Sequence, residues 1–234
     1  MNALDILYTP LDTPAVPNTD TTKLLSWVES YHKSQAHPNR LDSSKIEEVS
    51  TTYPWNIIYP RINHNWCYDF NTEFPELADF FSSAYKINES ELHSVVLLPV
   101  KSEFTGLGFW HSDPDVAGLR CYIENQEKGN DFLLIRPTIE PYNTKPQFGI
   151  LDPEFRTTPL QDVVLSAKLR EPNQTFYLNN VRAVHAANTQ TTGALRIAVI
   201  IGVDFFKVKD QINTLVVESA KKYNDYALYW NQPS

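Results

Sequence analysis

The residues best suited to chemistry are His111 and Asp113, which end an apolar stretch and stand two positions apart. Side chains of an extended strand alternate between its faces, so this spacing places an imidazole and a carboxylate on the same side. The pair alone is a short motif that occurs often by chance. His185, which follows Asn-Val-Arg-Ala-Val, is the best candidate for a third ligand on another strand. Two imidazoles and one carboxylate suit Fe(II) and leave coordination positions open, so we predict a metal site formed by these three residues.

Arg196 is the second unusual residue, because it stands in the otherwise apolar stretch 194–203. Burying a guanidinium without a partner is costly, so a strand of this composition requires a carboxylate nearby. A carboxylate can accept two parallel hydrogen bonds from one arginine. The partner is either an acidic side chain of the chain or the carboxylate of a small-molecule cosubstrate, and the residues alone leave both open.

The composition indicates one folded domain. A chain of 234 residues is long enough for one filled core, and β proteins of this size commonly remain single domains. The net charge of -8 disfavours nucleic acid as a partner, because phosphate binding requires clustered Lys and Arg. No apolar run approaches a membrane span, and the first residues lack the pattern of a secretory signal. We expect a cytoplasmic protein without a membrane partner, in which Cys67 and Cys121 stay reduced.

Helical and irregular patterns occur towards both ends of the chain. Residues 1–20 contain prolines and no clear period, which predicts an extended arm on the surface. The stretch 50–62 is β-branched and aromatic but interrupted by prolines, as in short edge strands. A C-terminal helix is expected to pack on the outside of the fold or to cover a dimer interface. Apolar residues recur at helical spacing over 21–35, 75–86 and 210–229.

From residue 92 the pattern changes to short strands separated by turn signals. Eight short strands favour a mainly β fold, a double-sheet jelly roll. We expect a single domain, 1–234, with a supporting part at 1–91, a jelly-roll core at 92–206 and the helix at 207–234. The long connection 137–161 is a candidate binding loop. The predicted strands are 94–104, 106–112, 119–124, 132–136, 163–169, 175–178, 182–187 and 195–205.

The order of these residues resembles the pattern of the Fe(II)- and 2-oxoglutarate-dependent oxygenases. That pattern is His-x-Asp, then a distant His, then an Arg on the following strand. In this chain the matching residues are His111, Asp113, His185 and Arg196. The resemblance extends over 106–204, less than half of the chain.

Within that superfamily the chain is most similar to the aspartyl/asparaginyl β-hydroxylase-like branch and its proline-hydroxylase relatives. In that branch a Leu-Arg-x-hydrophobic strand follows the first His, matched here by 119–122. An aromatic-Leu-Asn/Asp stretch precedes the distal His, matched by 176–180. Some members lack the metal carboxylate, whereas this chain has Asp113 and resembles a three-ligand site.

The resemblance implies a double-stranded β-helix (jelly roll, cupin-like) with supporting helices at both ends, and Fe(II) held by the two histidines and Asp113. It implies that 2-oxoglutarate binds as cosubstrate to Arg196, Arg120 and Tyr122. The expected reaction is hydroxylation of an amino acid or a peptidyl side chain, so the partner is a small molecule or a peptide. The candidate pocket residues are Trp110, Tyr177 and Arg182.

Two other functions remain open at this point. A cupin-like metal enzyme could use the same ligands to activate water or oxygen without 2-oxoglutarate. A non-catalytic jelly-roll binding domain could instead bury His111 and His185 as core residues. The two arginines discriminate between the first two functions, because only a dicarboxylate cosubstrate needs two cationic anchors.

Overall fold

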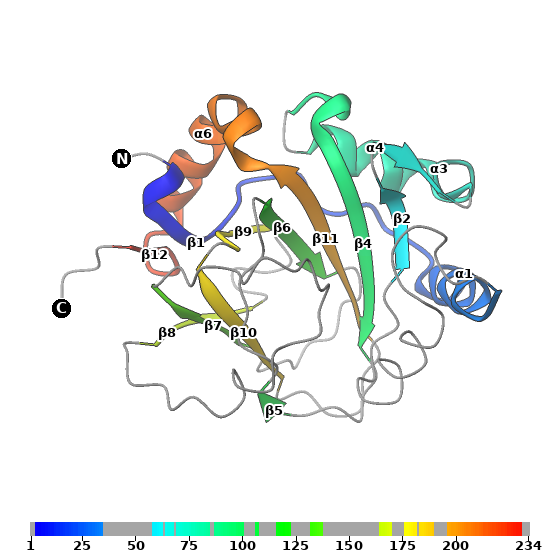
Figure 1. Cartoon of the computed structure of the whole chain (residues 1–234), viewed down its shortest axis with the longest axis horizontal. Coiled ribbons are helices and arrows are strands. Elements are labelled where there is room, and N and C mark those ends of the chain that lie inside the picture. The colour runs from blue at the N-terminus through cyan, green and yellow to red at the C-terminus, as the bar shows by residue number, and fades with distance from the viewer. Residues whose placement is uncertain are drawn as a thin grey trace, which may run out of the picture.

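The computed structural model shows two antiparallel β-sheets and helices that pack on the larger one (Figure 1). No helix in the part of the chain that it describes is long and apolar enough to cross a membrane. The described residues are 3–34, 58–62, 64–67, 69–84, 87–100, 106–107, 116–122, 132–137, 164–169, 176–181, 183–189 and 196–230.

The larger sheet has eight strands in the order β12-β1-β9-β6-β11-β4-β2-β3. Its long central strand β11 pairs with β4 on one side and with β6 on the other, both antiparallel. β11 is rich in Ile and Val, which suits a strand paired on both sides and covered on its faces. The strands are β1 (Ile6–Pro10), β2 (Ile58–Ile62), β3 (Asn65–Trp66), β4 (Leu92–Val100), β6 (Val116–Tyr122), β9 (Tyr177–Asn179), β11 (Arg196–Asp204) and β12 (Leu228–Tyr229).

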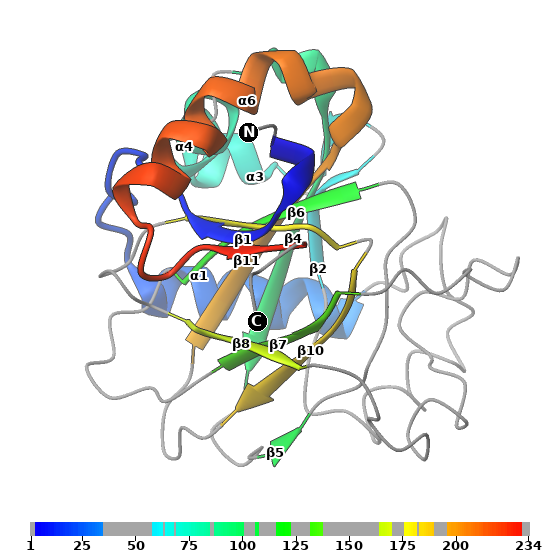
Figure 2. The ribbon, with the colours of Figure 1, turned by 90° about the vertical axis from the view of Figure 1, so that its left-hand side faces the viewer.

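The smaller sheet has four strands in the order β5-β10-β7-β8. These are β5 (Gly106–Leu107), β7 (Phe132–Arg136), β8 (Leu165–Lys168) and β10 (Val184–Thr189). Between β4 and β11 the chain passes repeatedly from one sheet to the other: β4, β6, β9 and β11 belong to the larger sheet, and β5, β7, β8 and β10 to the smaller. Figure 2 shows the smaller sheet beneath the larger one.

The larger sheet separates two hydrophobic cores. Val199 and Ile201 of β11 pack in one core with residues of the helices. Tyr8 and Tyr177 pack in the other core with Leu133 of the smaller sheet. The face of the larger sheet that carries Tyr177 is therefore the face towards the smaller sheet.

Helices α3, α4 and α6 lie on the opposite side of the larger sheet from the smaller sheet, and α1 lies beside β2 at one edge of the larger sheet (Figures 1 and 2). At the start of α1, the Asp20 carboxylate accepts a hydrogen bond from the Lys23 backbone N–H, which satisfies one of the free donors of the first turn. Helix α4 has proline at its start, where the missing N–H costs nothing. The helical segments are η1 (Ala3–Asp5), α1 (Thr21–Ser34), α3 (Phe70–Glu73), α4 (Pro75–Ser83), η2 (Glu89–Glu91) and α6 (Phe205–Lys222).

The prediction that residues 1–20 form an arm on the surface is wrong for the segment that forms β1. Residues of β1 are buried, and β1 pairs with β9 and β12 inside the larger sheet. A five-residue strand whose partners are distant in sequence leaves no periodic signal of its own. The C-terminal helix also differs: α6 begins at Phe205 and ends at Lys222, and Leu228 and Tyr229 form β12.

Candidate metal and cosubstrate site

Of the three predicted metal ligands, His185 is the one that lies among the described residues. It is the second residue of β10, and its side chain has no exposed surface. The ring Nδ1 lies 2.9 Å from the backbone carbonyl oxygen of Ala183. A carbonyl oxygen only accepts hydrogen bonds, so Nδ1 carries the proton and donates it. In the neutral ring Nε2 is then the nitrogen with the lone pair, which is how a metal-binding histidine is commonly oriented.

The pairing of β10 places His185 on the inner face of the smaller sheet. His185 pairs with Ile135 of β7, and paired residues share a face. Ile135 packs in the core that also contains Tyr8 and Tyr177 of the larger sheet. The preceding residue, Val184, and the following residue, Ala186, belong to a different cluster. The face that carries His185 is therefore the one towards the larger sheet.

The two predicted arginines lie on strands of the larger sheet, and their register places them on its inner face. Arg120 of β6 pairs with Tyr177 of β9 and with Ile200 of β11. Arg196 is four residues before Ile200 on the same strand, and this even separation places both residues on the same face of the sheet. Tyr122 pairs with Ala198 and belongs to the same face. The predicted cosubstrate residues thus share the face that carries Tyr177.

Tyr177, predicted as a pocket residue, is buried between the sheets and is 4% exposed. Its ring centroid lies 5.2 Å from that of Tyr8, and the rings are tilted by 42°. Tyr8 was not predicted, since it belongs to the strand that the sequence did not reveal. Together the two rings form an aromatic wall at the β1–β9 side of the space between the sheets.

Asn179 lies in the 176–180 stretch that carries the resemblance, but sequence reasoning assigned it no role. Its side chain has no exposed surface, and it stands on β9 two residues after Tyr177. Neither of its amide atoms has a hydrogen-bond partner among the residues that the structure describes. The sequence contains no signal for this, because most asparagines are exposed.

The other predicted site residues, namely His111, Asp113, Trp110 and Arg182, lie outside the described residues. Within the described part of the chain, no group of three or more His, Cys, Asp or Glu side chains is arranged so that it could hold a metal ion. The predicted triad as a whole therefore stays a prediction.

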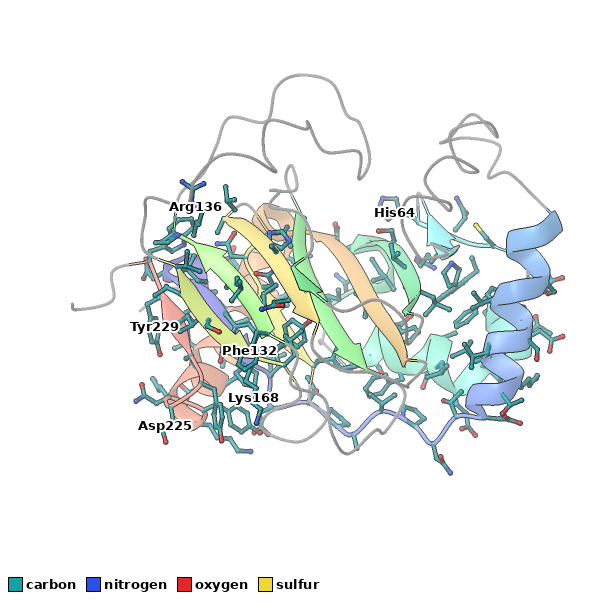
Figure 3. All side chains as sticks on the ribbon, turned by 90° about the horizontal axis from the view of Figure 1, so that it is seen from below. His64, Phe132, Arg136, Lys168, Asp225 and Tyr229 are labelled. Atoms are coloured by element: carbon teal, nitrogen blue, oxygen red, sulfur yellow. The ribbon has the colours of Figure 1, made fainter. Side chains whose placement is uncertain are left out.

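The smaller sheet carries two cations on its outer face. Arg136 and Lys168 follow Ile135 and Ala167, both of which pack in the core between the sheets. Figure 3 shows Arg136 and Lys168 towards opposite ends of this sheet, and His64 beside β2 and β3 on the other side of the molecule. These residues are separate from the candidate site.

No family model matches the chain, and no curated protein is similar to it. Among solved structures, the chain is similar to AviO1 from Streptomyces viridochromogenes, with 12% identity over 87% of this chain and 93% of that one, and a TM-score of 0.45. It is similar to the non-haem α-ketoglutarate-dependent epimerase SnoN from nogalamycin biosynthesis, with 12% identity, coverage of 87% and 80%, and a TM-score of 0.46. It is also similar to a prolyl hydroxylase from Trichoplax adhaerens in complex with a peptide. The identity is 12% over 85% of this chain and 86% of that one, and the TM-score is 0.39. Similarities at these TM-scores assign neither a family nor an activity to the chain.

Proposed function

We propose that the chain is an Fe(II)- and 2-oxoglutarate-dependent oxygenase that hydroxylates an amino acid or a peptidyl side chain. The observation that carries the proposal is His185, which is fully buried on the inner face of the smaller sheet and oriented by the Ala183 carbonyl. A solvent-excluded imidazole with Nδ1 fixed in this way presents Nε2 as its basic nitrogen. His111 and Asp113 supply the two further ligands in this proposal.

The passage of the chain between the sheets supports a jelly-roll fold. Eight strands from β4 to β11 are divided equally between two antiparallel sheets, and their order in each sheet is not their order in the chain. Long connections between sheets are typical of double-sheet jelly rolls. We infer that the space between the two sheets is the interior of this fold and holds the site.

The donor set fits Fe(II). Neutral imidazole and carboxylate ligands suit this ion, and a three-ligand set leaves positions for a cosubstrate. Bound Fe(II) and 2-oxoglutarate would, with O₂ as the oxidant, supply the oxidation of a substrate C–H bond. The chain contributes His185 as an oriented ligand and a buried aromatic wall, Tyr8 and Tyr177, that excludes water from one side.

The register of the arginines supports 2-oxoglutarate as cosubstrate. Arg120 and Arg196 stand on neighbouring strands and share one face of the larger sheet. A dicarboxylate has two anionic ends, and each can form a charge-assisted contact with one guanidinium. A metal enzyme without 2-oxoglutarate, the competing function, would not require two positively charged residues on this face.

The proposal is tested by measuring succinate formed from 2-oxoglutarate by the purified chain with added Fe(II). We expect Fe(II)-dependent succinate formation that accelerates when the substrate is present. Anaerobic titration of Fe(II), monitored by thermal stability, gives a readout of metal binding that does not depend on turnover. Metal binding without any effect of 2-oxoglutarate would favour the competing metal enzyme. Absence of both responses would refute both enzyme functions.

A further inference from the structure

Tyr8 belongs to a strand at the start of the chain, and its ring lies in the core between the two sheets, where it is 1% exposed. Its backbone pairs with Asn179 of β9, so Tyr8 is the diagonal neighbour of Tyr177, two residues earlier on that strand. Diagonal neighbours on one face of a sheet are within reach of aromatic side chains. The ring centroids of Tyr8 and Tyr177 lie 5.2 Å apart, which is the separation of an aromatic pair in contact.

The backbone on which Tyr8 stands is held from both sides. On the side of β9, the Asn180 backbone N–H donates a hydrogen bond to the Leu7 carbonyl oxygen at 2.9 Å. On the side of β12, the Trp230 backbone N–H donates to the Asp5 carbonyl oxygen at 3.1 Å. Side chains on strands that are paired in this way are placed more precisely than side chains on loops. Tyr8 is therefore a fixed support for the ring of Tyr177.

Tyr177 is in turn the direct neighbour of Arg120. The two residues are paired between β9 and β6, and Tyr177 faces the core between the sheets. Directly opposed residues have Cβ atoms about 4.5–5.5 Å apart, so the position of one side chain limits the conformations open to the other. An arginine side chain that is free to move loses conformational entropy when it binds an anion, which lowers the affinity. A fixed ring beside Arg120 reduces this loss.

We propose that Tyr8 is a positioning residue of the cosubstrate site. Its ring fixes the ring of Tyr177, and Tyr177 limits Arg120 to conformations suited to binding one carboxylate of 2-oxoglutarate. The inference rests on the proposed function, in which Arg120 is a cosubstrate residue. It goes further by giving the N-terminal strand β1 a role in the affinity of the site. Ordering one long side chain lowers an affinity about two- to ten-fold, and Tyr8 reduces this loss.

The test is a titration of 2-oxoglutarate into the full-length chain with a redox-inert divalent metal, which measures binding without turnover. Tyr8→Leu removes the ring and should lower the affinity about two- to ten-fold, with metal affinity unchanged. Tyr8→Phe retains the ring and should bind like wild type. A loss in Tyr8→Phe equal to that in Tyr8→Leu would assign the effect to the hydroxyl and overturn the proposal. Tyr8→Met, whose flexible side chain fills more of the space, replaces Tyr8→Leu if that variant does not fold.

Phe80→Leu is the matched control, because it removes a similar ring contact on the opposite face of the same strand. The Phe80 ring packs against Phe176, the residue before Tyr177, with the centroids 5.3 Å apart. Phe80 and Phe176 belong to the core on the helix side of the larger sheet. This variant should lower the melting temperature and leave the affinity for 2-oxoglutarate unchanged. An equal loss of affinity in Phe80→Leu and Tyr8→Leu would show that general loosening of β9 weakens binding, which would overturn the proposal.

A double-mutant cycle distinguishes positioning through Arg120 from a general effect on the site. In an Arg120→Gln background, Tyr8→Leu should cause no further loss of affinity, because the side chain that Tyr8 positions is absent. In an Arg196→Gln background, Tyr8→Leu should cause its full loss. Additive losses in both backgrounds, or wild-type affinity in Tyr8→Leu itself, would overturn this inference and leave the proposed function intact. A wild-type chain that does not bind 2-oxoglutarate would instead contradict the proposed function, and this role of Tyr8 with it.

Discussion

Arg120 of β6 and Tyr177 of β9 are directly paired in the larger sheet, and Tyr177 is buried in the core between the two sheets. This pairing fixes the face to which Arg120 belongs. Arg196 shares that face and is four residues along β11 from Ile200, the other partner of Arg120. Four residues of strand span about 13 Å, a distance that two arginine side chains can bridge to the ends of a small dicarboxylate.

Replacing either arginine should weaken cosubstrate binding. We expect Arg196→Gln and Arg120→Gln each to reduce the affinity for 2-oxoglutarate about 10- to 100-fold, the range expected for hydrogen bonds between charged groups. The measurement is isothermal titration of 2-oxoglutarate in the presence of a redox-inert divalent metal. Metal affinity should be retained, because neither arginine is a ligand.

Lys168→Gln is the matched control for the arginine variants. It also removes one positive charge, but from the outer face of the smaller sheet. Its affinity for 2-oxoglutarate should equal that of the wild type. Equal losses in all three variants would mean that net charge alone attracts the dicarboxylate, and the assignment of Arg120 and Arg196 would be wrong.

His185→Gln should abolish metal binding. The loss of a partner outside the ligand set already costs about 10- to 100-fold in metal affinity, so loss of the ligand itself should exceed 100-fold. Anaerobic competition for Fe(II) against a chromophoric chelator measures this affinity. Glutamine retains a polar side chain of comparable size, which limits the damage to the core.

His64→Asn serves as the control for His185→Gln. His64 is exposed, lies beside β2 and β3 away from the smaller sheet (Figure 3), and has a φ angle of 66°. Asparagine tolerates this left-handed conformation, so the substitution adds no strain. Fe(II) affinity should be unchanged. A His185→Gln chain that folds and binds Fe(II) like wild type would remove His185 from the metal site.

Asp69 is the residue at which substitution by glycine should stabilise the fold. It has φ 54° and ψ 24° at the N-terminus of α3, and its side chain makes no capping hydrogen bond. Glycine adopts this conformation without the Cβ clash, although it loses more backbone entropy on folding. We expect Asp69→Gly to raise the free energy of unfolding by about 0.5 kcal/mol.

Asp79→Gly tests the same substitution in a helical conformation. Asp79 is exposed within α4, where glycine is less favourable than aspartate by about 0.3 kcal/mol. Urea denaturation of the two variants should therefore give changes of opposite sign. A loss of stability in both variants would show that the left-handed conformation of Asp69 carries no strain.

The parts of the fold that the sequence predicts well have local signals. The strand predicted at 132–136 is confirmed with the same bounds as β7, because apolar residues there are flanked by turn-forming stretches. The strand predicted at 195–205 is confirmed as β11. In contrast, β1 and β12 pair with each other across almost the whole chain, and β12 has only two residues. Pairing over such a distance depends on tertiary contacts that no local window contains.

The features of the candidate site also differ in whether the sequence alone predicts them. His185 and Arg196 were found from residue type and position, whereas Arg120 was found only from the family resemblance. The structure shows that His185 is buried and that both arginines lie on strands. Their common face depends on strand register, which becomes known only from pairing. The unpaired amide of Asn179 could not be predicted, since nothing in a sequence distinguishes a buried asparagine from an exposed one.

Stability should decrease above about pH 10, because Lys222 and Tyr229 have raised pKa values in the folded chain. The Lys222 ammonium donates a 2.6 Å hydrogen bond to Asp12, and this contact raises the pKa of Lys222. Burial raises the pKa of the Tyr229 phenol. Both groups bind protons more tightly in the folded chain than in the unfolded one. Their contribution to stability is therefore complete below the ordinary pKa values and is lost as pH rises through the raised ones.

The measurement is the urea midpoint of unfolding at a series of pH values from neutral to about pH 11, the range in which Lys and Tyr side chains lose their protons. Asp12→Asn removes the carboxylate that holds Lys222 but retains the backbone N–H that donates to the Ser219 hydroxyl at 2.8 Å. In this variant the decrease above pH 10 should become shallower, because the unfolded and folded pKa values of Lys222 move together. A variant that loses stability as steeply as the wild type would show that the Asp12–Lys222 contact does not contribute to the alkaline transition.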